Sequence, residues 1–170
     1  AHPPGLALFC LLHKAVTFLL PFGDIAFRGN LASGLLGALS AAWTVRVAIR
    51  LGAHPWCATL ATPLVLTSPV FLLHSVTVEV YSGVVLLCLV ALELVLLGRQ
   101  KEDRRYWALA AFVLGLCIGG HHGELRIFAL LMMATILLSH RDVRVWSVCA
   151  VSGVFGSLVT LYLPIRAQTQ

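Results

Sequence analysis

Long apolar runs separated by short polar connections form the dominant pattern of this chain. The runs lie at about residues 5–20, 31–51, 58–78, 80–98, 107–120, 125–139 and 145–163. A helix needs roughly 20 residues to cross the hydrocarbon of a bilayer, because each residue advances it by about 1.5 Å. The runs at 31–51, 58–78, 80–98 and 145–163 have this length. The pattern therefore predicts helices that cross a membrane.

Composition supports a membrane protein. The chain has 170 residues, of which 59% are hydrophobic and 11% charged, whereas soluble domains are about half apolar and a quarter charged. The net charge of +5 does not indicate a nucleic-acid partner, because the basic residues are spread over short connections and form no tract. We predict an all-α polytopic bundle with about six spans plus one interfacial or re-entrant helix in a single domain, 1–170.

The basic residues orient the bundle. Those that follow the runs at 31–51, 80–98 and 125–139 are Arg46, Arg50, Arg99, Lys101, Arg104, Arg105, Arg141 and Arg144. These connections lie two spans apart, so they share one side, and their positive charge predicts that this side is cytoplasmic. Lys14, Arg28, Arg126 and Arg166 then belong to the external side.

The first run has two interpretations under this orientation. Residues 21–30 are external, because the run at 31–51 ends in the cytoplasm. The run at 5–20, with His13 and Lys14 inside it, either lies along the external interface or dips in and returns. The alternative is an ordinary crossing helix with a cytoplasmic N-terminus, and the pattern leaves both open.

Polar side chains gather at the external ends of the apolar runs. They are His2, Asp24, Arg28, Asn30, Glu79, Tyr81, His121, His122, Glu124, Arg126 and Arg166. Charged groups near hydrocarbon depth are costly and persist where they line a cavity or pair with each other. Simpler readings remain for two of them: Glu79 as a turn carboxylate and Arg166 as an interfacial anchor.

The stretch GGHHGELRIF at 119–128 connects two short runs. Helices of about 14 and 15 residues extend roughly 21–23 Å, less than a hydrocarbon core of about 30 Å. The connection is therefore expected to dip below the external surface, where irregular backbone needs a water-filled cavity or surrounding protein. The alternative is a solvated turn in a locally thinned bilayer.

Common catalytic and metal motifs are absent from the sequence. His121 and His122 are adjacent, so on a helix they would diverge by about 100°, and no HExxH motif or matching Cys/His set accompanies them. We expect no metal site and no cofactor, with a divalent cation left open as an alternative.

Five stretches resemble one family. They are AHPPG, DIAFRGNLASGLLGALSAA, VEVYS, GLCIGGHHG and LYLPIRA. In this order they resemble the protein O-mannosyltransferase-like membrane domain family, bacterial relatives of transmembrane protein 260 within the GT-C glycosyltransferase superfamily. The resemblance implies a multi-pass enzyme that transfers a sugar, mannose being the candidate, from a polyprenyl-phosphate donor. The acceptor would be a hydroxyl of a protein or glycan on the external face.

The same resemblance implies site residues. Its HPP element maps onto His2, its EVY onto Glu79 and Tyr81, and its histidine onto His121 and His122. These residues would orient donor or acceptor.

The resemblance also implies groups that hold the donor phosphate. Its LPxRA motif maps onto Arg166, and Arg28 or Arg126 would act with it or in its place.

Two departures from the family pattern stand out. The acidic catalytic base is expected upstream of Ala1, so we predict a fragment truncated at both ends. GELR is unlike the family, which leaves the roles of Glu124 and Arg126 open.

The expected location is a bacterial inner membrane. The alternative function is a non-catalytic transporter segment or assembly scaffold, since Gly-interrupted short spans also occur in transporters.

Overall fold

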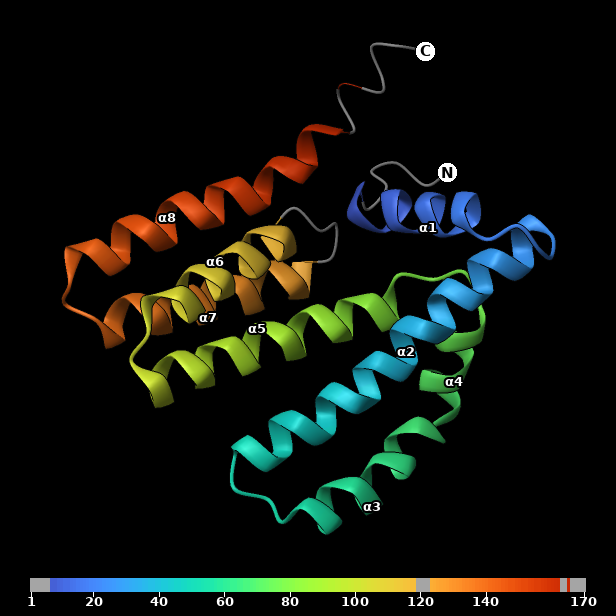
Figure 1. The fold of residues 1–170 in the computed structure, drawn as a ribbon, viewed down its shortest axis with the longest axis horizontal. Coiled ribbons are helices and arrows are strands. Elements are labelled where there is room, and N and C mark those ends of the chain that lie inside the picture. The colour runs from blue at the N-terminus through green and yellow to red at the C-terminus, as the bar shows by residue number, and fades with distance from the viewer. Residues whose placement is uncertain (1–6, 119–122, 163–164, 166–170) are drawn as a thin grey trace. The chain divides into compact units, whose positions relative to one another are not determined.

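The computed structural model describes residues 7–118, 123–162 and 165, and every regular element in these ranges is helical (Figure 1). This confirms the predicted all-α class. Within these ranges, three helical segments are long and apolar enough to cross a membrane: Ile25–Arg50, Tyr81–Lys101 and Val143–Leu161. A bent pair of helices would make a fourth span. The predicted number of about six spans stays a prediction.

The chain divides into two compact units. The N-terminal unit is Phe9–Leu89, and the C-terminal unit is Val90–Gln170 together with Ala1–Leu8. The boundary falls within one continuous helix, α5 (Tyr81–Lys101). Each unit is described by itself below, and the single domain expected from the sequence stays a prediction.

The N-terminal unit begins with α1 (Ala7–Leu19) and α2 (Ile25–Arg50). α2 starts earlier than the apolar run at 31–51 because Asp24 caps it. The Asp24 carboxylate accepts a hydrogen bond of 2.7 Å from the Phe27 N–H, which satisfies one of the free donors at a helix start. The cap therefore places Arg28 inside the first turns of α2 and not in a loop.

The length of the run at 58–78 predicted one crossing helix, but the run does not form one straight helix. It forms α3 (Pro55–Leu66) and α4 (Pro69–Val76), which meet at an angle of 73°. Pro69 causes the break, since proline lacks the N–H needed to continue a helix and forces the preceding residue out of the helical region. Ser68 accordingly has φ −56° and ψ 126°.

α2 meets α4 (Figure 1), and small residues line the face of α2 that meets α4 and the turn after it. Gly29, Ser33 and Gly37 recur at a spacing of four, which puts them on one face of a helix. A Cβ added at Gly29 would come within 2.6 Å of Val78 Cγ2, and one at Gly37 would meet Ser75 Oγ. Such small residues let backbones approach closely in membrane bundles, and here they admit the α4–α5 turn.

The C-terminal unit contains the end of α5, then α6 (Arg104–Ile118), α7 (Gly123–Ser139), α8 (Val143–Ser157) and a 3₁₀ turn, η1 (Leu158–Leu161). α6 packs against both α7 and α8 (Figure 1). Both α6 and α7 are short, in agreement with the prediction from the runs at 107–120 and 125–139. The connection at 119–122, and with it the predicted polar dip, lies outside the described residues.

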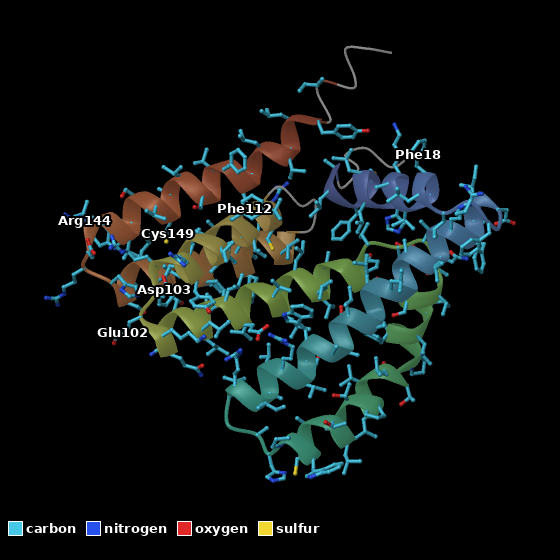
Figure 2. All side chains as sticks on the ribbon, in the orientation of Figure 1. Phe18, Glu102, Asp103, Phe112, Arg144 and Cys149 are labelled. Carbon is cyan, nitrogen blue, oxygen red and sulfur yellow. The ribbon has the colours of Figure 1, made fainter. Side chains whose placement is uncertain are left out.

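Glycines bring α6 and α8 into backbone contact. A Cβ at Gly115 would overlap the carbonyl group of Gly153, and one at Gly156 would overlap the carbonyl oxygen of Phe112. Cys149 Sγ lies 3.6 Å from the Trp107 carbonyl oxygen, to which it donates a weak hydrogen bond. Figure 2 labels Phe112 on α6 and Cys149 on α8 along this contact. The outer face of α8 carries exposed apolar side chains such as Val151 and Phe155, as expected of a helix in lipid.

Candidate functional site

The predicted binding residues fall into three groups. Arg28, Glu79 and Tyr81 lie in the N-terminal unit, and Arg126 lies near the start of α7 in the C-terminal unit. His2, His121, His122 and Arg166 lie outside the described residues. The structure therefore places Arg28, Glu79 and Tyr81 in one unit, and the roles of all the predicted site residues stay predictions.

Glu79 occupies the turn between α4 and α5, and this turn is bonded to the buried Ser33 of α2. Ser33 Oγ lies 3.3 Å from both the backbone N and the backbone O of Glu79. On the same side, Ser82 Oγ donates to the Ser33 carbonyl oxygen over 3.3 Å, and Ser40 Oγ donates to the Ser82 carbonyl oxygen over 2.9 Å. The serines thus hold both ends of the VEVYS motif against α2.

His13 of α1 completes this network. Its Nδ1 lies 2.8 Å from the Phe9 carbonyl oxygen, and its Nε2 lies 3.2 Å from Ser33 Oγ. A carbonyl oxygen can only accept, so Nδ1 carries the hydrogen, and in the neutral ring Nε2 then accepts from the Ser33 hydroxyl. Ser33 Oγ in turn accepts from the Glu79 N–H. His13, Ser33 and Glu79 therefore form one chain of hydrogen bonds across three elements.

Tyr81 begins α5 and packs against His74 of α4. The ring centroids are 4.4 Å apart, at an interplanar angle of 45°. His74 Nδ1 is buried and has no hydrogen-bond partner among the described residues. A buried polar atom of this kind is costly unless a water or ligand satisfies it.

An apolar cavity of about 480 Å³ opens at this ring pair. Its walls are Val65, Ser68, Val70, Phe71, His74, Tyr81, Ser82 and Val85. A mostly apolar wall with a few convergent polar groups is typical of a small-molecule site, and the volume lies in the usual range of about 300–1,000 Å³. The cavity therefore places an apolar chamber directly beside the EVY residues.

Arg28 holds the connection between α1 and α2. Its Nε donates to the carbonyl oxygens of Phe22 and Gly23 over 3.0 and 3.1 Å, and Nη1 donates to that of Thr17 over 2.9 Å. These bonds tie the connection between α1 and α2 to the helix that follows it. The neighbouring Gly29 contacts Val78, so Arg28 lies on the segment that meets the Glu79 turn.

The described part of the chain contains no group of three or more His, Cys, Asp or Glu side chains placed to hold an ion, and the expected absence of a metal or cofactor stays a prediction.

Sequence reasoning missed four residues of this site: His13, Ser33, His74 and Ser82. The signal for Ser33 was its place at the spacing of four between Gly29 and Gly37. A small-residue stripe marks a face of close approach, and the one hydroxyl in its middle meets whatever packs there. His74 stood in an apolar run and carried no motif, so nothing in the sequence distinguished it.

Comparisons with known proteins agree with the resemblance. Residues 1–147 match the model of a family described as the Protein O-mannosyl-transferase TMEM260 N-terminal domain. The Mus musculus protein named Protein O-mannosyl-transferase TMEM260 is 30% identical over 176 residues, which cover 98% of this chain and 25% of the mouse protein. The chain thus spans about a quarter of the length of this curated relative. No solved structure matches it.

Proposed function

Because this chain belongs to the Protein O-mannosyl-transferase TMEM260 N-terminal domain family, we propose that it is the part of a membrane glycosyltransferase that binds the lipid-linked sugar donor. Membership makes the chain a multi-pass membrane protein related to a glycosyltransferase. The finer proposal is transfer of a sugar, mannose being the candidate, from a polyprenyl phosphate to a hydroxyl of a protein or glycan at the external face.

One observation carries the proposal: the apolar cavity ends at the fixed VEVYS turn. A polyprenyl-phosphate sugar is an amphiphile, with an apolar tail joined to a charged and polar head. Its binding site needs aliphatic and aromatic walls that end at hydrogen-bonding groups. Val65, Val70, Phe71 and Val85 supply such walls, and His74 Nδ1, which has no partner among the described residues, supplies a polar group beside them.

The chemistry follows from the donor. A base removes the proton of the acceptor hydroxyl, the oxygen attacks the anomeric carbon, and the bond from that carbon to the phosphate oxygen breaks. The electron pair leaves with the phosphate, so nearby guanidinium groups stabilise the transition state. Arg28, Arg126 and Arg166 are the candidates for that role. The identity of the base is left unassigned, and His2, His121 and His122 are proposed to orient donor or acceptor.

Glu79 contributes to the proposed site through the fixed position of its backbone. Its backbone N–H donates to Ser33 Oγ over 3.3 Å, and its side chain is half-buried. A carboxylate fixed this way can hold sugar hydroxyls in one orientation, and orientation of reactants supplies a large share of enzymatic rate.

The test is transfer of labelled mannose from polyprenyl-phosphate donors by the full-length protein in membranes. We expect Glu79→Gln to lower the transfer rate by about tenfold or more, the equivalent of about 1.4 kcal/mol of transition-state binding. Val85→Trp fills the cavity and is expected to raise KM for the donor. Leu130→Trp, at an exposed position on α7, is the matched control and should leave KM unchanged. Wild-type transfer by both Glu79→Gln and Val85→Trp would refute the assignment.

A further inference from the structure

We propose a second binding site, in the C-terminal unit, for the head group of a phospholipid that bears a primary amine. The site is a cavity of about 710 Å³ where the end of α5 and the start of α6 meet the end of α7 and the start of α8. Figure 2 labels Glu102 at the α5–α6 connection and Arg144 at the start of α8, at the same end of this unit. The residues that define the chemistry are Arg99, Glu102, Arg104, Trp107, His140 and Asp142.

The floor of the cavity is a packed aromatic pair. Trp107 is 1% exposed, and a Cβ at Gly98 would come within 2.7 Å of its indole ring. The His140 ring stands edge-on to Trp107, with centroids 4.5 Å apart and an angle of 72° between the planes. His140 Nε2 is buried without a hydrogen-bond partner among the described residues. Buried polar atoms are normally hydrogen-bonded, and the described residues supply no partner for this one.

Glu102 adds a second, independent signal. Its φ is 52°, in the left-handed region, and its N–H donates to the Gly98 carbonyl oxygen over 2.9 Å. Glycine or asparagine usually occupies such a position at the end of a helix. The strained position places the Glu102 side chain at the wall of the cavity, and strained backbone tends to cluster at functional sites.

The charges on the wall select the ligand. Two guanidinium groups, Arg99 and Arg104, and two carboxylates, Glu102 and Asp142, line one cavity. Neither arginine makes an ion pair or hydrogen bond with another described side chain. A purely anionic ligand would face the carboxylates, and a purely cationic one would face the guanidiniums. A phosphodiester joined to an ammonium group matches both, and both contacts are charge-assisted hydrogen bonds.

The surroundings favour a lipid over a soluble phosphoamine. Leu138 and Val143, beside the cavity in sequence, are 87% and 69% exposed. Trp146 donates its indole N–H to the His140 carbonyl oxygen over 2.8 Å, in the manner of an interfacial tryptophan. Basic pockets between transmembrane helices are known lipid head-group sites. A lipid would reach this one with its acyl chains along the apolar helix faces.

This site is separate from the one proposed for sugar transfer. Its residues lie at the connections rich in arginine, which the charge distribution assigns to the cytoplasmic side. α6 leads away from it toward residues 119–122 over 15 residues, or roughly 22 Å.

The experiment uses the full-length protein, purified and delipidated in detergent, with bound lipid counted by native mass spectrometry. Phosphatidylethanolamine, phosphatidylcholine and phosphatidylglycerol with the same acyl chains are offered in equal amounts. We expect phosphatidylethanolamine to be retained in preference, since a trimethylated amine has no N–H to donate to Glu102 or Asp142. Soluble glycerophosphoethanolamine should fail to compete.

Substitutions in the wall of the cavity test whether the lipid binds there. Arg99→Gln with Arg104→Gln should lower retention of phosphatidylethanolamine by about tenfold or more, because contacts to charged groups are each worth about that factor. The control pair, Arg105→Gln with Arg141→Gln, removes the same charge from two positions that do not line the cavity. Glu102→Gly relieves the backbone strain and keeps the fold, yet should abolish the preference for the amine lipid.

Three results would overturn the proposal. They are equal retention of the three lipids by the wild type, an equal loss in the control pair, and full competition by glycerophosphoethanolamine.

Discussion

Replacing Ser33 with alanine tests the network on which the candidate site depends. The residue is 0% exposed. Its hydroxyl oxygen lies 3.2 Å from His13 Nε2 and 3.3 Å from the backbone N and O of Glu79. The substitution removes one oxygen atom, so it leaves almost no cavity. Its cost therefore measures the hydrogen bonds themselves.

The magnitude follows from the groups left without partners. Each buried donor or acceptor that loses its partner costs about 1–3 kcal/mol. Ser33→Ala leaves the Glu79 N–H and one ring nitrogen of His13 without a hydrogen-bond partner. Because both hydrogen bonds are long, each loss is expected at the low end of this energy range. We expect a loss of about 2–3 kcal/mol in the free energy of unfolding. The Glu79 turn also becomes free to move, so we expect transfer to fall about tenfold or more at equal amounts of folded protein.

The assay compares unfolding in detergent and initial transfer rates for the full-length protein. Ser147→Ala is the matched control, since the Ser147 hydroxyl bonds only to the Arg144 carbonyl oxygen of its own helix and is exposed. A double-mutant cycle with His13→Phe should show coupling of about 0.5 kcal/mol or more, as expected of residues in contact. If Ser33→Ala and Ser147→Ala were to differ by less than about 0.5 kcal/mol, the normal scatter of surface changes, the network would not stabilise the turn.

Two further predictions concern packing and topology. Gly115→Ala should lower stability by about 1–3 kcal/mol in thermal unfolding, because its Cβ overlaps the Gly153 carbonyl group and overpacking costs this much. Gly34→Ala, whose Cβ meets only ordinary contacts, is the control, and equal melting of the two variants would contradict the α6–α8 contact. α5 has 21 residues, about 31 Å of helix, so cysteines introduced at Val78 and Arg105 should react with an impermeant reagent from opposite sides of the membrane. Reaction of both from one side would contradict the orientation.

The candidate site was only partly predictable, for a physical reason visible in its residues. Glu79 and Tyr81 stood out because a carboxylate and a phenol interrupted a long apolar run, which is a local signal. Their partners did not stand out. Ser33 meets Glu79 across 46 residues of chain, and His74 meets Tyr81 only because Pro69 bends the α3–α4 pair. Pro69 is visible in the sequence, but the apolar run at 58–78 is long enough for one crossing helix, so its length did not predict the break.

Local hydropathy and residue type by themselves determined the helical class, the membrane environment and the short helices on either side of residues 119–122. Each of these depends on neighbours within a few turns, where period and apolar length decide the outcome. Tertiary structure alone decided that His13, Ser33 and Glu79 form one hydrogen-bonded chain. It likewise decided that Trp107 and His140 floor a cavity between four helix ends. Such contacts depend on which helix faces approach closely enough to exclude other side chains, and no local pattern carries that information.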